Sequence, residues 1–335
     1  MLKKLTFISL ILLSFASCEE NKKSQSQSHS QSQSQSQSQS QSQAVPNFNA
    51  DSAYHYVKQQ LDFGPRVPGS EAHAQCVDYF IDFFNDKADT VYVQNFRTRL
   101  YNGKGIDGKN IIASFNPDAK KRILLAAHYD SRPFADHDPD KKNWNTPIDG
   151  ANDGASGVGV LMEIARLLKD NPTKTGIDII LFDLEDYGAP AYENVMTNDD
   201  WALGSQYWSK NPHIYGYRAY FGILLDMVGA SNPKFPKEYY SQQFAPSVCD
   251  NVWNMARELG YSDYFTNEIG HPINDDHIYV NTIANIPMID IIHLENNEES
   301  SFYPHWHTLK DNIEQIDPKT LGMVGDVVIN VIYNS

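Results

Sequence analysis

The stretch from Arg122 to Gly188 constrains the fold of this chain more than any other part of its sequence. Residues 123–127 and, apart from Asp178, 177–182 are apolar runs of strand length, and a helical pattern through Asp170 lies between them. Each of the three segments adjoins a polar cluster, namely His128-Tyr129-Asp130-Ser131, Asp149-Gly150-Ala151-Asn152-Asp153-Gly154 and Asp183-Leu184-Glu185-Asp186. Because ligands bind outside the carboxyl ends of the strands in a parallel α/β sheet, these clusters predict a site at that edge.

Strands and helices alternate along the rest of the chain as well. Strands are predicted at 91–100, 110–115, 220–225 and 287–292, and helices at 51–61, 70–84, 201–209, 247–259 and 317–333. A further short helix is expected to begin near His277. This order predicts a single α/β domain with a central, mostly parallel or mixed sheet and helices on both faces.

The first 45 residues are predicted to lie outside the folded domain, which we expect at 46–335. Residues 1–17 indicate a signal peptide, with a basic start and an apolar stretch shorter than the roughly 20 residues of a membrane-spanning helix. Phe15-Ala16-Ser17-Cys18 is similar to a bacterial lipobox, in which Cys18 is lipidated; an ordinary signal peptide with a chance cysteine is the alternative. Residues 18–45 contain a Ser-Gln alternation without apolar side chains, which predicts a flexible tether.

These features predict an exported protein that is lipid-anchored in the periplasm or outer membrane of a Gram-negative-type cell, and we expect a monomer. The formal net charge of −15 and the pI of about 5.1 disfavour nucleic acid as a partner. Two cysteines remain in the folded domain, Cys76 and Cys249. They could pair in an oxidising compartment or stay buried thiols, and the sequence leaves both open.

Acids and histidines recur where strands end and loops begin, and they are His128, Asp153, Glu185, Asp186, Asp226, Asp275 and His307. Zinc binds histidine nitrogen and carboxylate oxygen, and a catalytic zinc keeps three protein ligands and one open position. A neighbouring carboxylate that is not a ligand can transfer protons. Taken singly, Asp153 and Asp275 could cap helices, and the other residues could be solvated or structural polar groups. Their coincidence at one edge of the sheet favours a site.

The chain resembles a known family through an ordered set of motifs: His-Tyr-Asp-Ser, Gly-Ala-Asn-Asp-Gly-Ala-Ser-Gly, Phe-Asp-Leu-Glu-Asp, Leu-Asp-Met-Val-Gly, Asp-Asp-His and Trp-His-Thr. This set is similar to the zinc exopeptidase superfamily, whose aminopeptidase-like fold it implies. Within that superfamily the chain looks most like glutaminyl cyclases of the animal type, which also occur in bacteria. The segment 63–70 is similar too, so the resemblance covers nearly the whole folded part.

The resemblance implies one zinc ion per chain and a role for each matching residue. The zinc ligands would be Asp153, Asp186 and His307. Glu185 would be the catalytic acid and base, with Asp226 and Asp275 as a hydrogen-bonded supporting pair.

Two features depart from the family. The animal enzymes carry Glu at the ligand position where this chain has Asp186, so the shorter side chain requires the backbone to lie closer to the metal. The tryptophan that lines the family's pocket soon after the acidic pair has no aligned match, and Trp201 is the nearest candidate. Phe302 and Trp306 fall where the cyclases keep aromatic pocket walls.

The predicted reaction converts the N-terminal Gln of peptides or exported proteins to pyroglutamate and releases ammonia. The alternative is a two-zinc aminopeptidase, which would use His128 and the same acids; a third possibility is a surface lipoprotein that uses the fold only for binding. The aromatic residues near His307, namely Phe302, Tyr303 and Trp306, favour the cyclase, since the peptidases usually carry Tyr directly before that His. Cyclisation also has its nucleophile inside the substrate, so a narrow pocket that excludes water and folds the Gln side chain suits it.

Overall fold

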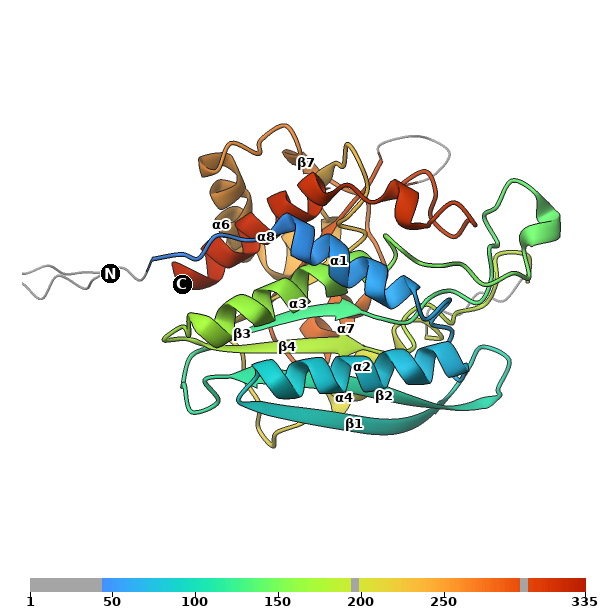
Figure 1. The fold of residues 1–335 in the computed structure, drawn as a ribbon, viewed down its shortest axis with the longest axis horizontal. Helices are drawn as coiled ribbons and strands as arrows, with labels where there is room; N and C mark the ends of the chain where they lie inside the picture. The colour runs from blue at the N-terminus through green and yellow to red at the C-terminus, as the bar shows by residue number, and fades with distance from the viewer. Residues whose placement is uncertain (1–43, 194–198, 296–300) are drawn as a thin grey trace, which may run out of the picture. The chain divides into compact units, whose positions relative to one another are not determined.

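One mixed six-stranded sheet forms the centre of the molecule, with the strand order β1-β2-β4-β3-β5-β8. The computed structural model describes residues 44–193, 199–295 and 301–335 (Figure 1), so the predicted signal peptide and nearly all of the predicted tether lie outside the described residues. The strands are β1 (Thr90–Arg99), β2 (Gly105–Phe115), β3 (Arg122–His128), β4 (Gly176–Phe182), β5 (Phe221–Asp226) and β8 (Met288–Ile292). β3 pairs in parallel with β4 and β5, and β5 with β8, whereas β1–β2 and β2–β4 are antiparallel.

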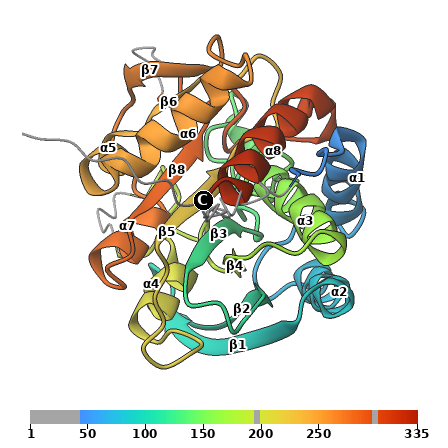
Figure 2. The ribbon, with the colours of Figure 1, turned by 90° about the vertical axis from the view of Figure 1, so that its left-hand side faces the viewer.

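The four parallel strands are buried along their whole length, as expected for strands with helices on both faces. Alternate side chains enter two cores. One core packs against α1 (Ala50–Leu61), α2 (Glu71–Lys87), α3 (Ala155–Asp170), α6 (Pro246–Glu258) and α8 (Pro318–Tyr333). The other packs against α4 (Leu203–Lys210) and α7 (Asp276–Thr282), and Figure 2 shows the sheet between these layers. The predicted α/β fold with a mixed sheet flanked by helices is confirmed.

Three short elements were not predicted: β6 (Phe235–Lys237), α5 (Tyr239–Phe244) and β7 (Phe265–Ile269). β6 and β7 form a small parallel sheet of their own. β6 has only three residues, and most of β7 is exposed, so neither carries an apolar run that a sequence pattern could detect. Single-turn 3₁₀ helices also occur at Lys141–Asn143 and Ile313–Gln315.

Both cysteines of the folded domain are free and buried, so Cys76 and Cys249 do not pair. Burial raises the pKa of each thiol to about 12. In the described part of the chain, every helix is too short or too polar to cross a bilayer.

Two glycines let α3 approach the carboxyl ends of β3 and β5. A Cβ atom on Gly157 would lie 2.2 Å from the carbonyl oxygen of Leu225, and one on Gly154 would lie 2.5 Å from the carbonyl oxygen of His128. Any side chain at either position would push the helix away from the sheet. The glycines therefore bring the turn that carries Asp153 next to His128.

A buried ion pair fixes the amino-terminal end of the parallel strands. Arg122 donates to both carboxylate oxygens of Asp178, each at 2.6 Å, and the Arg122 and Asp178 side chains are 10% and 0% exposed. Ser114 and Tyr217 also donate their hydroxyls to Asp178. The pair therefore joins β2, β3 and β4 at the edge of the sheet opposite the predicted site.

We predict that Arg122→Leu destabilises the fold by about 3–5 kcal/mol, because it leaves the Asp178 carboxylate buried without its cation. Urea unfolding measures this loss. The matched control is Arg97→Leu, which removes the exposed Arg97–Asp107 pair (71% and 74% exposed) and should cost less than about 1 kcal/mol. Equal losses of unfolding free energy in the two variants would show that the buried pair stabilises the fold no more than the exposed pair does.

Candidate functional site

One small cavity of about 50 Å³ lies at the carboxyl edge of the sheet, and it is lined by all nine residues to which the family resemblance gave a catalytic, metal-binding or pocket role. Its lining is Asp153, Glu185, Asp186, Trp201, Asp226, Ile273, Asn274, Asp275, Phe302, Trp306 and His307. The residues come from the turn before α3, the loop after β4, the end of β5, the loop before α7 and the loop that follows residue 301. The fold thus gathers side chains that are far apart in the sequence.

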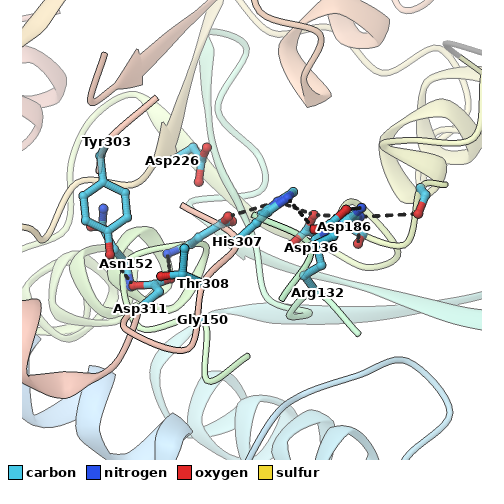
Figure 3. Close-up of polar contacts among 12 residues, drawn as sticks. Arg132, Asp136, Gly150, Asn152, Asp186, Asp226, Tyr303, His307, Thr308 and Asp311 are labelled. Atoms are coloured by element: carbon cyan, nitrogen blue, oxygen red, sulfur yellow. Dashed lines mark hydrogen bonds and ion pairs between the residues drawn. The ribbon is translucent and has the colours of Figure 1, made fainter. Parts of the chain in front are cut away.

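The three predicted metal ligands meet at this cavity. Nε2 of His307 lies 3.1 Å from Oδ1 of Asp186 (Figure 3). The same nitrogen lies 3.6 Å from Oδ2 of Asp153. Each residue offers a ligand atom, these atoms lie within 4.8 Å of one another, and all three side chains are buried.

The chemistry of this group fits a divalent cation. Among the described residues, no hydrogen-bond donor reaches Oδ2 of Asp153 or Oδ2 of Asp186. A buried acceptor without a partner costs about 1–3 kcal/mol, and two adjacent carboxylates also repel each other. Two carboxylates and one imidazole are a ligand set that zinc accepts, and three protein ligands leave one position open.

Asp136 supports His307 from behind and was not predicted as a site residue. Its Oδ1 lies 3.4 Å from Nδ1 of His307, and its two oxygens accept hydrogen bonds from Arg132 at 2.9 and 2.6 Å. Burial opposes ionisation of Asp136, but the hydrogen bonds from Arg132 and the nearby His307 ring hold its pKa well below the usual range. The contact between Asp136 and His307 is at ion-pair distance, and a carboxylate on the far side of a metal-ligating histidine favours one orientation of the ring.

Arg132 connects this support to the second ligand loop. Its guanidinium donates to the carbonyl oxygens of Asp186, Gly188 and Ala189 at 3.1–3.3 Å, and its Nη1 lies 3.6 Å from Oδ1 of Asp186 (Figure 3). It also lies 4.6 Å from the centre of the Trp201 ring. Arg132 and Asp136 belong to the long acidic loop between β3 and α3, and the unusual length of that loop is the sequence signal that could have found them.

Two further buried carboxylates hold the backbone of the ligand turns. Asp130 accepts the N–H groups of Glu185 and Asp186, each at 3.1 Å. Asp311 accepts those of Asn152 and Asp153 at 2.9 and 3.1 Å. Asp311 also accepts the Tyr303 hydroxyl at 2.9 Å (Figure 3), so each turn is fixed by a carboxylate from another segment.

The structure shows whether Asp153 and Asp275 cap helices or belong to the site. Asp153 has only the second role, whereas Asp275 has both. The N-cap of α3 is Gly154, without a side-chain hydrogen bond, so Asp153 does not cap this helix. Asp275 does cap α7, because its carboxylate accepts the N–H of Asp276, and it lines the cavity as well.

His128 lies between two acids of the site. Its Nε2 lies 3.0 Å from Oδ1 of Asp153 and 3.3 Å from Oδ1 of Asp226. Burial opposes a charge on His128, but the neighbouring carboxylates of Asp130, Asp153 and Asp226 raise its pKa well above the ordinary value. His128, Asp153 and Asp226 also form a group whose ligand atoms lie within 4.8 Å, so Asp153 belongs to two potential ligand sets.

Glu185 is a buried acid of the cavity whose surroundings favour the neutral carboxyl group. Burial raises the pKa of its carboxyl well above the ordinary value; the charge of His128 opposes this shift, and those of Asp275 and Asp186 add to it. Burial, together with the charge of Asp153, also raises the pKa of Asp226 to about 7. A carboxyl group that can hold a proton near neutral pH is suited to general acid and base catalysis.

Aromatic rings enclose the cavity around His307. Trp306 stacks on His307 with ring centroids 3.6 Å apart, and Phe302 stacks on Trp306 at 4.2 Å. Trp201 lies nearly parallel to His307 at 6.2 Å. The structure therefore places all three predicted aromatic residues at the cavity.

The comparisons with known proteins agree with these observations. The model of peptidase family M28 matches residues 110–332. A glutaminyl-peptide cyclotransferase from Gloydius blomhoffii is 29% identical over 249 residues, which are 65% of this chain and 63% of that protein. The aligned region thus spans less than two thirds of the length of that curated relative.

Solved structures match over most of both chains. The glutaminyl cyclase of Bacteroides thetaiotaomicron, solved with N-acetylhistamine, is 50% identical, with a TM-score of 0.85 and coverage of 87% of this chain and 100% of that one. A protein from Bacteroides thetaiotaomicron described as a leucine aminopeptidase precursor is also 50% identical, with a TM-score of 0.84 and coverage of 87% and 99%.

We predict that Asp136→Asn weakens zinc binding by about 10–100-fold, because the amide cannot hold His307 as the carboxylate does. Competition with a chromogenic chelator measures the affinity directly. The matched control is Asp140→Asn in the same loop, which changes only the cap of a 3₁₀ turn and should retain the wild-type affinity. An unchanged affinity in the Asp136 variant would show that Asp136 does not support a metal ligand.

Proposed function

The chain belongs to peptidase family M28 and groups there with bacterial glutaminyl cyclases, as its sequence motifs predicted, and we propose that it is a zinc-dependent glutaminyl cyclase. It would convert the N-terminal Gln of peptides or exported proteins to pyroglutamate with release of ammonia. The observation that carries this proposal is the small aromatic-walled cavity that contains Glu185 beside the Asp153–Asp186–His307 group.

The residues of the chain divide the reaction between them. Asp153, Asp186 and His307 would hold one zinc ion, which when bound supplies Lewis-acid polarisation of the substrate γ-carbonyl. Glu185 takes a proton from the α-amine as its nitrogen bonds to the carbonyl carbon (Cδ) of the side-chain amide. Glu185 then delivers that proton to the γ-amide nitrogen, and the C–N bond breaks to release ammonia. Asp275, with Asp226, steadies the tetrahedral intermediate or its leaving group.

The walls of the cavity favour ring closure. Trp201, Phe302 and Trp306 leave little room beside Glu185, so a bound Gln side chain is held close to its own α-amine. Such proximity can supply several kcal/mol of the barrier, on the order of 7 kcal/mol in well-oriented cases. The same walls exclude water, which competes as a nucleophile.

The group formed by His128, Asp153 and Asp226 favours a second candidate, a two-zinc aminopeptidase, because a second metal would need such ligands. The contacts of His128 support the cyclase instead. Its Nε2 lies 3.0 Å from Asp153 and 3.3 Å from Asp226, so a proton on this nitrogen bridges the two carboxylates, and a protonated nitrogen does not bind a metal.

Zinc content and reporter peptides separate the two candidates. We predict ammonia release from Gln-initiated dipeptides, no cleavage of Leu-initiated ones, and one zinc per chain. Glu185→Gln should lower turnover by at least about 100-fold, the lower bound for general acid–base catalysis, with zinc content unchanged.

The matched control is Glu193→Gln, an exposed position in the same loop that should retain full turnover. Cleavage of the Leu-initiated peptide with two zinc ions per chain would establish the aminopeptidase. Loss of zinc from the Glu185 variant would mean that the roles of Glu185 and Asp186 are wrongly assigned.

We also propose that Cys18 is lipidated and anchors the exported domain through the Ser/Gln-rich tether, in the periplasm or outer membrane of a Gram-negative-type cell. The motif Phe15-Ala16-Ser17-Cys18 after a short apolar stretch supports this proposal. The domain would then act as a monomer on exported chains whose processing exposes Gln.

We predict that the full chain incorporates radiolabelled palmitate and fractionates with membranes. Cys18→Ser should abolish both, because no thiol remains to accept the lipid. Cys76→Ser, which changes a buried thiol of the folded domain, is the control and should retain the label. A Cys18 variant that stays in the membrane fraction would contradict lipid anchoring.

A further inference from the structure

A second cluster of buried titratable side chains lies behind the cavity wall and has no part in the proposed chemistry. Glu238, His277 and Asp290 are each fully buried, and Asp275 joins them from the cavity lining. They come from the residue before α5, from α7, from β8 and from the residue before α7. Ligand atoms of Asp275, His277 and Asp290 lie within 4.8 Å of one another.

Glu238 anchors the cluster. Its carboxylate accepts the N–H groups of Tyr240 at 2.9 Å and Ser241 at 2.6 Å, and thereby caps α5. It also accepts the N–H of Ile273 at 3.0 Å and contacts Nε2 of His277 at 3.1 Å. Burial opposes ionisation, but these hydrogen bonds lower the pKa of Glu238, so it remains a carboxylate.

An ionised Glu238 fixes the tautomer of His277. A carboxylate only accepts hydrogen bonds, so Nε2 of His277 must carry the hydrogen. Nδ1 on the opposite side of the ring then faces Oδ2 of Asp290 at 4.0 Å. A second route reaches Asp290 through Ser241, whose hydroxyl donates to Glu238 at 2.8 Å and accepts the N–H of Asp290 at 2.9 Å.

Asp290 lies between this anchor and the cavity. Burial, with the charges of Asp275, Asp226 and Glu238, raises the pKa of Asp290 well above the ordinary value, and an oxygen of its carboxyl group lies within 4.8 Å of one of Asp275. Glu238 also fixes Ile273, which lines the cavity two residues before Asp275. Glu238 therefore holds the segment that carries Asp275 at both ends, through the N–H of Ile273 and the ring of His277.

We propose that Glu238 is a positioning residue, which through His277, Ser241 and Ile273 holds Asp290 and Asp275 in place at the cavity wall. The inference rests on the proposed function for the role of Asp275. Glu238 does not reach the cavity, so its effect on turnover must pass through Asp275.

A double-mutant cycle between Glu238→Gln and Asp275→Asn tests this dependence. Glu238→Gln alone should lower kcat by up to about 100-fold, the effect of a misplacement near 1 Å, with a smaller change in KM and unchanged zinc content. In the Asp275→Asn background the same substitution should have almost no further effect. Glu238→Asp, which keeps the charge, should restore part of the lost turnover.

A structural role alone predicts a different pattern. Asp317→Ala removes another N-cap side chain, at α8, and serves as the control that lowers the melting temperature while kcat at a permissive temperature stays at the wild-type value. Multiplicative losses in the cycle would overturn the proposal. So would the loss of a bound zinc ion in Glu238→Gln or His277→Gln, because this would make the cluster a metal site.

Turnover in the double-mutant cycle is measured with the reporter peptide that the wild-type protein converts. If the enzyme cleaves Leu-initiated peptides, the proposed function has failed, and non-additivity there still supports the role of Glu238. If the wild type turns over neither reporter, both proposals fail.

Discussion

The site depends on buried carboxylates that accept two consecutive backbone N–H groups. Asp130 holds the turn of Glu185 and Asp186 in this way, and Asp311 holds the turn of Asn152 and Asp153. Each buried acid gains the hydrogen bonds that its burial requires, and each turn loses its freedom to relax. Leu184, Met227 and His307 adopt left-handed conformations beside these turns, at a cost of about 1–2 kcal/mol each, which the surrounding hydrogen bonds must offset.

This arrangement concentrates negative charge in a region of low dielectric, and two features of the structure reduce the resulting repulsion. Fixed positive charge is supplied by Arg132, which holds Asp136 ionised and lies next to Asp186. The second feature is burial, which raises the pKa values of Glu185, Asp226 and Asp290 and so favours their neutral carboxyl groups. Neither effect provides a hydrogen-bond donor for Oδ2 of Asp153 or Oδ2 of Asp186. A divalent cation bound between these two oxygens would balance their charge.

The sequence predicted those parts of the molecule that carry a periodic or ordered signal. The buried strands, the long helices and the acids at strand ends were visible as apolar runs followed by polar clusters, and the motif order indicated which acids belong together. Arg132, Asp136, Asp311 and Glu238 were not predicted, because they act from loops where no periodicity marks a side chain that points inward. Trp201 shows the limit of motif reasoning, since only the structure places its ring parallel to His307. The strands β6 and β7 were not predicted because they are too short to show a clear sequence pattern.

Asp153 belongs to both potential ligand groups, and this shared residue shows how one fold can support two chemistries. A neutral His128 with a free Nε2, together with Asp226, would give a second metal the ligands that it needs. Three acids face this ring, with Asp130 at 3.7 Å in addition to Asp153 and Asp226, and all of them favour the imidazolium. A proton on His128 therefore competes with a second cation for the same place. A proton on His128 would leave Asp153 to a single metal, as the proposed cyclase requires.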